Sequence, residues 1–235
     1  MNKFAFTLAE VLITLGIIGV VAALTLPTLI QTNKNLEVEA KLKKFYSIMN
    51  QAIMLSELKN GDYNYWPAPC GNTTCEEYLA KYYKPYFTTI KLTKFNSYGG
   101  NNVAYYFNDG TAVVFKAEGG KFDIFFFPNA KNLDPDNFAE TNDDGSIASR
   151  QGSGISYFPF QTIPPNDESG HTMKRFRNKK FSPYIHDLRC WSEACLTDPG
   201  NTWACHKDAP LKGWCTALIF YHGWKIPKDY PFKVR

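Results

Sequence analysis

The chain has 235 residues, of which 44% are hydrophobic and 16% aromatic, and its formal charge is +4. The residues that follow an N-terminal apolar segment are about as many as one ordinary domain contains, which is enough to bury a core. A positive balance this small does not by itself imply a nucleic-acid partner.

An uncharged apolar run lies close to the N-terminus. Residues 11–30 carry no charge, and as a helix rising about 1.5 Å per residue they span roughly 30 Å, the hydrocarbon thickness of a bilayer. Glu10 precedes this run, and Lys3 is the one basic residue before it. The run predicts a membrane span that begins with an ionisable residue, which is costly at membrane depth and usually has a partner.

Two conventional interpretations of this run are open. A secretory signal peptide would be cut after Ala23, although the apolar residues continue to Ile30. A plain single-pass anchor fits the length of the run and leaves Glu10 unexplained.

The string KFAFTLAEVLITLGIIGVVAALTLP resembles the N-terminus of type IV pilins and type II secretion pseudopilins. The resemblance implies that a prepilin peptidase removes residues 1–5 by cutting between Ala5 and Phe6, and that Phe6 is then N-methylated. Glu10 becomes the fifth mature residue, where this family carries a Glu that acts in subunit assembly. Ala5 departs from the Gly that usually precedes the cut.

Thr7 and Glu10 also have the spacing of a helix capping box, in which each side chain bonds the backbone N–H of the other residue. A carboxylate at this position complements the positive end of a helix. This local role needs no partner. A helix cap and a contact between subunits are therefore both open for Glu10.

The helical pattern continues past Pro27, which lacks an N–H and predicts a kink. Apolar residues recur at steps of three and four from residue 38 onward, and charged residues cover the other side. This amphipathic segment predicts that the helix leaves the membrane and packs one face on a domain. Gly61 suits the C-terminal cap. We therefore expect a helix over residues 6–58, with its transmembrane part at residues 6–30, and an exported head over residues 59–235.

An even number of cysteines behind a membrane-targeting segment indicates disulfides in an exported domain. Short loops favour pairing in sequence order. A zinc site formed by the last four cysteines, with His206 nearby, is the alternative, although their spacing contains no CxxC pair. The cysteines, in order, are Cys70, Cys75, Cys190, Cys195, Cys205 and Cys215.

Three segments predict neighbouring β-strands. Residues 103–107, 112–116 and 121–127 are rich in β-branched and aromatic side chains. Residues 108–110 and 118–120 contain the Gly of hairpin turns, so the three strands are expected to form an antiparallel meander.

Further elements are expected on either side of this meander. Residues 76–83 predict a short helix, and residues 155–160 and 216–221 predict strands, with Pro159 marking an edge strand. A long helix followed by a meander predicts an α+β fold, in which the amphipathic half of the helix packs on an antiparallel sheet. Within the pilin resemblance this is the α/β roll of the head.

Two charged stretches are candidate binding sites. Acidic side chains offer oxygen ligands to Ca²⁺, without EF-hand spacing, and a solvated loop is the alternative. Basic side chains interleaved with Phe176 could hold DNA phosphates, and the alternative is a solvated loop or a surface that pairs with a neighbouring subunit. The acidic residues are Asp134, Asp136, Asp143 and Asp144. The basic residues, within 174–180, are Lys174, Arg175, Arg177, Lys179 and Lys180.

The sequence contains no HExxH, GxSxG, GxGxxG or Walker motif, so no enzyme is predicted. Calcium is the candidate cofactor, beside the zinc alternative at the cysteines. Lysines on both sides of the apolar run make the positive-inside rule ambiguous, and the cysteines favour a head outside the cytoplasm.

These features and the pilin resemblance predict a structural subunit of a type IV pilus-like or type II secretion pseudopilus filament. The size of the chain and two long polar connections, at about residues 128–154 and 161–190, favour a minor subunit. The resemblance implies a single-pass protein of the bacterial inner membrane, with a cytoplasmic N-terminus and a head that is periplasmic or extracellular. Its partners would be other pilin or pseudopilin subunits, the prepilin peptidase and the inner-membrane assembly platform. The alternatives are an exported or membrane-anchored protein that binds glycans or DNA, cut after Ala23, and an anchored enzyme. The sequence does not distinguish a pilus from a secretion or DNA-uptake system.

Overall fold

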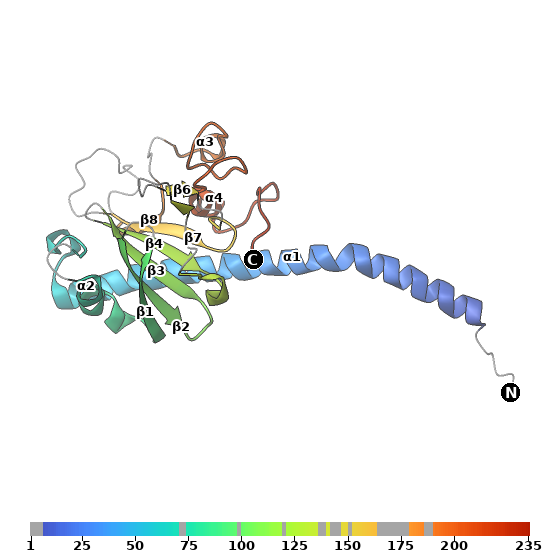
Figure 1. The fold of residues 1–235 in the computed structure, drawn as a ribbon, viewed down its shortest axis with the longest axis horizontal. Helices are drawn as coiled ribbons and strands as arrows, with labels where there is room; N and C mark the ends of the chain where they lie inside the picture. The colour runs from blue at the N-terminus through green and yellow to red at the C-terminus, as the bar shows by residue number, and fades with distance from the viewer. Residues whose placement is uncertain are drawn as a thin grey trace.

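The chain forms an α+β fold in which one long helix packs on a six-stranded antiparallel sheet and extends far beyond it (Figure 1). This is the predicted fold class. The structure, a computed structural model, describes residues 7–70, 74–97, 100–118, 121–135, 140–141, 147–149, 152–163, 179–185 and 190–235.

The long helix is α1, Leu8–Asn60. It ends where the sequence predicts, because Gly61 adopts φ 83° and its N–H donates to the Glu57 carbonyl at 2.9 Å. A positive φ is readily accessible only to glycine. The helix passes through Pro27 without a break, and its ribbon bends within the N-terminal half (Figure 1).

The second half of α1 forms part of the head's core. Phe45 stacks on Phe126 with ring centroids 4.3 Å apart, and it contacts Phe160 and Phe181 edge-on at 5.2 and 5.9 Å. Aromatic pairs at such distances add to the free energy gained by burying their area. The predicted apolar stripe is confirmed, since its members are all buried: Val38, Leu42, Phe45, Met49 and Ala52.

The sheet contains the predicted meander, extended by one strand before it and two after it. Its strand order is β1-β2-β3-β4-β7-β8, and each neighbouring pair is antiparallel. The edge strand β1 was not predicted, because its lysines and threonines do not stand out as a buried strand. The strands are β1 Thr89–Ser97, β2 Gly100–Phe107, β3 Ala112–Glu118, β4 Lys121–Phe127, β7 Phe158–Thr162 and β8 Phe181–Pro183.

Side chains alternate between the two faces of this sheet, and both faces are buried. Phe115 and Phe126 point into the core that contains the α1 stripe. Their neighbours Val114 and Phe125 point to the opposite face, where they form a second cluster with Tyr157. A period of two along each strand produces this division.

The expectation that Pro159 marks an edge strand is wrong, because β7 lies between β4 and β8. The Pro159 carbonyl accepts a hydrogen bond from the Tyr184 N–H at 3.0 Å. The N–H and C=O of one strand residue point to the same neighbour, so the missing N–H of Pro159 falls on the side of the short strand β8. The ladder to β4 is therefore kept.

The strand expected over residues 216–221 is also wrong, because these residues belong to the helix α4, Cys215–Tyr221. Ala217, Leu218 and Ile219 are consecutive and all buried, and α4 packs on α3, β7 and β8. A short apolar run buried on every side shows neither period, so sequence does not separate helix from strand.

The remaining elements are short, and they include the predicted helix after residue 75. The helices are α2 Cys75–Tyr82 and α3 Glu193–Leu196, with 3₁₀ turns η1 Tyr63–Tyr65, η2 Lys84–Tyr86 and η3 Ala130–Asn132. A separate hairpin pairs β5 Glu140–Thr141 with β6 Ile147–Ser149.

Candidate membrane and assembly segment

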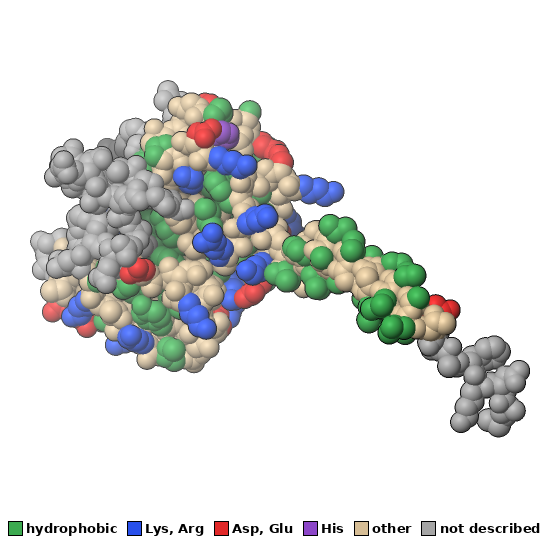
Figure 2. All heavy atoms as spheres, turned by 45° about the vertical axis from the view of Figure 1, so that its right-hand side comes forward, with side chains coloured by type: hydrophobic (Ala, Val, Ile, Leu, Met, Phe, Trp, Pro, Cys, Tyr) green, Lys and Arg blue, Asp and Glu red, His purple; other side chains and the backbone are tan. Residues whose placement is uncertain are grey.

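The first half of α1, residues 8–30, projects from the head with its apolar side chains exposed. Leu12 and Leu15 are each 60% exposed, and Leu24 is 73% exposed. Figure 2 shows hydrophobic side chains covering this projecting part of the helix. In the described part of the chain, α1 is the helix that is long and apolar enough to cross a membrane, and none of its apolar window is buried. These side chains are free to face lipid or other helices.

Thr7 and Glu10 form the predicted capping box at the start of α1. The Thr7 N–H and hydroxyl donate to Glu10 Oε2 at 2.8 and 2.7 Å, and the Glu10 N–H donates to Thr7 Oγ1 at 3.2 Å. The helix thus starts with two of its exposed donors satisfied by its own first turn. Ala5 and Phe6, the predicted cleavage and methylation positions, lie outside the described residues.

The apolar half of α1 ends where the last residues of the chain meet the helix. Gln31 follows the apolar run directly, and its Nε2 donates to the Val234 carbonyl at 3.4 Å. The Arg235 N–H donates to the Ile155 carbonyl at 2.9 Å, and Asn132 Nδ2 donates to the Arg235 carbonyl at 3.3 Å. Figure 1 shows the C-terminal end beside α1. No pattern in the sequence indicated this contact.

A second contact joins the C-terminal segment, residues 222–235, to α1 about two helical turns further along. Glu39 is 8% exposed and accepts hydrogen bonds from Lys225 Nζ at 2.8 Å and from the Ile226 N–H at 3.0 Å. The buried Trp224 packs on Tyr46 of α1 with ring centroids 5.1 Å apart. The contacts at Gln31 and Glu39 together fix the C-terminal segment to the helix just beyond its apolar half.

The lysines that follow the apolar run are partly neutralised by the head. Lys41 Nζ donates to Glu37 at 2.6 Å and to the Pro128 carbonyl at 2.8 Å, and Lys44 Nζ lies 2.7 Å from Asp109. Burial alone would raise the pKa of Asp109, but hydrogen bonds from Lys44 and Thr111, with the charge of Lys44, bring the pKa below its usual value. Lys41 and Lys44 therefore have carboxylate partners. A count that treats them as free charges overstates the positive charge that follows the apolar run.

Glu57, near the end of α1, forms an ion pair with Lys180 of the predicted basic stretch. Lys180 Nζ lies 2.5 and 2.6 Å from the two carboxylate oxygens of Glu57, and Glu57 also accepts from the Tyr63 N–H at 2.9 Å. Lys179 is exposed. The rest of the stretch, Lys174, Arg175 and Arg177, lies outside the described residues. Lys180 therefore already has an anionic partner within the head.

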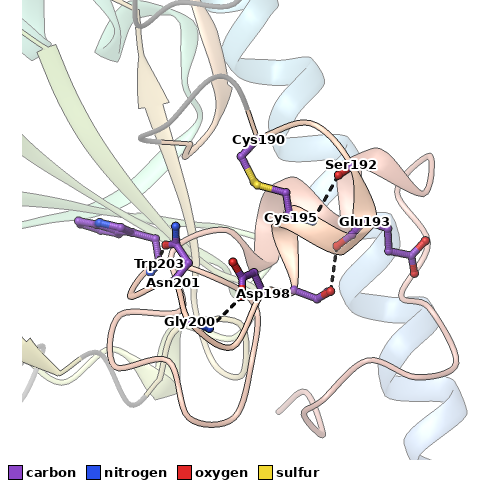
Figure 3. The surroundings of a disulfide bond; sticks show 9 residues. Cys190, Ser192, Glu193, Cys195, Asp198, Gly200, Asn201 and Trp203 are labelled. Carbon is purple, nitrogen blue, oxygen red and sulfur yellow. Dashed lines mark hydrogen bonds between the residues drawn. A yellow bond between two sulfur atoms is a disulfide. The ribbon is translucent and has the colours of Figure 1, made fainter.

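The six cysteines form three disulfides in sequence order, as the short loops predicted: Cys70–Cys75, Cys190–Cys195 and Cys205–Cys215. The zinc alternative is wrong, because the sulfurs it requires are bonded to one another. Figure 3 shows the bond between Cys190 and Cys195, where the Ser192 hydroxyl accepts from the Cys195 N–H at 3.3 Å and so caps α3. Cysteines of this region join Leu196, Trp214 and Leu218 in a second core beside the sheet.

The acidic candidates for calcium are mostly outside the described residues. Asp134 is described and exposed, while Asp136, Asp143 and Asp144 are not described. Among the residues that the structure does describe, no group of three or more His, Cys, Asp or Glu side chains could hold a metal ion. The calcium site stays a prediction.

A cavity of about 440 Å³ that the sequence did not indicate lies between α1 and the turn that joins β2 to β3. Its walls are largely apolar, and the ion pair of Lys44 and Asp109 lines one part of it. It has the size of a small ligand site. The apolar lining includes Phe45, Ile48, Ala52, Leu55, Phe87, Phe107 and Phe126.

Fold and surface together define a class of protein: an α+β head with three disulfides, carried on a helix whose other half is long and apolar enough to cross a membrane. Residues 28–234 match DUF6613, a family of unknown function, and the chain belongs to that family. The matched region contains the head and the amphipathic half of α1, and most of the apolar run precedes it. No curated protein and no solved structure gives a significant match.

Proposed function

We propose that this protein is a structural subunit of a type IV pilus-like or type II secretion pseudopilus filament, and a minor one. The observation that carries the proposal is the division of α1. Its second half is the core of its own head, while the apolar side chains of residues 8–30 remain exposed. A subunit held in the membrane and then moved into a filament needs such a helix, because lipid covers it first and the helices of neighbouring subunits cover it later.

In this proposal a prepilin peptidase removes residues 1–5 on the cytoplasmic side of the bacterial inner membrane, and Phe6 becomes the methylated N-terminus. The head lies outside the cytoplasm, which the three disulfides support, since such bonds persist in oxidising compartments. The assembly platform of the inner membrane and the other subunits are the partners.

The charged amine of a mature Phe6 gives Glu10 a role beyond capping. In an incoming subunit this amine pairs with Glu10 of a subunit already in the filament, which offsets the desolvation of both charges in an apolar setting. The pair also sets the axial stagger between neighbouring helices.

The mature N-terminus tests the processing step. We expect the intact mass of protein purified from its native membrane to correspond to a chain that starts at Phe6 and carries one methyl group. A chain that starts at Leu24 would instead support the exported binding protein with a conventional signal peptide.

Glu10→Gln tests the role in assembly. Glutamine keeps the capping box but cannot form the ion pair, so we expect normal membrane abundance and a loss of filament incorporation to background. The matched control is Glu77→Gln, because Thr74 and Glu77 form the same capping box at the start of α2 in the head. The control should assemble normally. Normal assembly of Glu10→Gln would leave Glu10 as a helix cap alone.

A further inference from the structure

Basic side chains gather where the C-terminal segment meets α1. Gln31, the first residue after the apolar run, contacts the Val234 carbonyl, so Lys233 and Arg235 flank a buried residue at that level of the helix. Lys34 lies three residues after Gln31 and therefore on the same side of α1. It is four residues beyond Ile30, about 6 Å along the axis.

Lys131 belongs to the same place, since it precedes Asn132, which donates to the Arg235 carbonyl. The four side chains are exposed, and no ion pair of theirs is found in the described part of the chain. We call these residues the basic collar: Lys34, Lys131, Lys233 and Arg235. Figure 2 shows Lys and Arg side chains around the place where the helix leaves the head.

The collar differs from three nearby lysines that form ion pairs within the chain, whereas Lys43 and Lys228 are exposed like the collar residues. Lys41, Lys44 and Lys225 have carboxylate partners at 2.6–2.8 Å within the head. Two acidic residues lie near the collar. Glu37 forms an ion pair with Lys41, and Asp134 lies two residues after Asn132 in the sequence. The collar therefore presents basic side chains at the one level where a membrane-inserted helix would meet the headgroups.

We propose that the basic collar contacts the anionic headgroups of the membrane that α1 enters, and that it holds the head on that surface. The inference rests on the proposed membrane insertion. The potential of an anionic lipid surface falls off within a Debye length of about 8 Å at physiological salt, and the collar lies within about that distance of the apolar run. Each basic residue near such a surface strengthens the attraction about fivefold. Extraction of a subunit from the bilayer then breaks the contacts between the collar and the headgroups. These contacts weaken as the salt concentration increases.

Hydrogen–deuterium exchange of the full chain in lipid nanodiscs tests this proposal. One set of discs contains phosphatidylcholine alone, and the other contains phosphatidylcholine mixed with phosphatidylglycerol. We expect peptides from residues 228–235 to exchange at least about fivefold more slowly in the anionic discs, the effect of one basic residue at the surface. High salt should remove the difference. This comparison uses the unaltered protein and does not depend on the folding of a variant.

Two variants assign the effect to the collar. The collar variant carries Lys34→Gln, Lys131→Gln, Lys233→Gln and Arg235→Gln. The control removes the same number of charges from exposed positions of the head outside the collar: Lys59→Gln, Lys81→Gln, Lys84→Gln and Lys179→Gln. The collar variant should lose the lipid dependence, and the control should keep it.

The outcomes separate this inference from the proposed function. Equal exchange in the two kinds of disc, with the chain inserted in both, overturns the collar and leaves membrane insertion intact. Equal losses in the collar variant and the control also overturn it, since net charge alone would then act. A chain that does not enter the discs overturns the proposed membrane insertion and the collar together.

Discussion

The two halves of α1 belong to one unbroken helix and meet different surroundings. In residues 8–30 apolar side chains cover the whole circumference and are exposed, whereas residues 31–60 bury a single stripe against the sheet. A helix that is apolar all round needs an apolar environment on every side, while a stripe needs one partner. The head therefore covers the apolar side chains of the second half only. The apolar side chains of the first half need cover from outside the described chain, such as lipid or other helices.

Two glutamates repeat this contrast. Glu10 accepts hydrogen bonds from Thr7, three residues away, and is exposed. Glu39 is buried and depends on Lys225 and Ile226, which come from the far end of the chain. Glu10 is therefore satisfied by its own helical turn, whereas Glu39 is satisfied by the tertiary fold.

The largest expected effect is on Phe45, at the centre of the aromatic core. Phe45→Ala removes a ring that stacks on Phe126 and leaves a cavity. We expect the free energy of unfolding of the head to fall by about 3–5 kcal/mol. Chemical denaturation of the full chain in detergent, followed by aromatic fluorescence, measures the loss.

Leu15→Ala is the matched change in the other half of the helix. Leu15 is 60% exposed and packs on no part of the head, so the same unfolding measurement should show no change. A leucine favours insertion by about 0.5 kcal/mol at the centre of a span, and Leu15 lies nearer one end, so only a small weakening of membrane partition is expected. A similar loss of head stability from both variants would contradict the division of the helix.

The next effect concerns Glu39. Glu39→Ala leaves the Ile226 N–H without its acceptor beside a buried surface, and we expect a loss of about 1–3 kcal/mol in unfolding free energy. Glu37→Ala is the control, because Glu37 is 60% exposed and pairs only with Lys41 one turn away. Such pairs contribute about 0.5 kcal/mol or less. Equal effects of the two variants would show that the C-terminal segment does not depend on Glu39.

The smallest effect is that of the exposed ion pair between Lys44 and Asp109. The pKa of Asp109 in the folded chain is below its usual 3.8, so its carboxylate stabilises the fold fully above the unfolded pKa. That contribution is lost as the pH falls through the folded pKa. Asp109→Asn should cost less than about 1 kcal/mol at neutral pH, because both side chains are more than a third exposed.

Urea denaturation of this variant and the unaltered protein at neutral and acidic pH gives the answer. The two stability curves should converge below the folded pKa of Asp109. A difference that persists in acid would show that the substitution acts through something other than the charge of Asp109, because asparagine keeps an oxygen that can accept the hydrogen bond from Thr111.

Much of this protein follows from patterns that are local in the chain. The uncharged run, the stripe from Val38 to Ala52, the capping box at Thr7 and the three-stranded meander each arise from residues within a few turns or one hairpin of each other. The disulfides pair in sequence order for the same reason, because their loops are short. Local geometry limits such features to one arrangement, so sequence alone predicted them.

The tertiary structure decided the rest. Residues 215–221 form a helix although their apolar run shows the period of neither helix nor strand. Pro159 lies in the interior of the sheet because its missing N–H faces the short strand β8. The contact of Val234 with Gln31 joins residues 203 positions apart, and the basic collar exists only through it. Contacts between distant residues leave no period or spacing in the sequence, since their free energy depends on which surfaces the folded chain brings together.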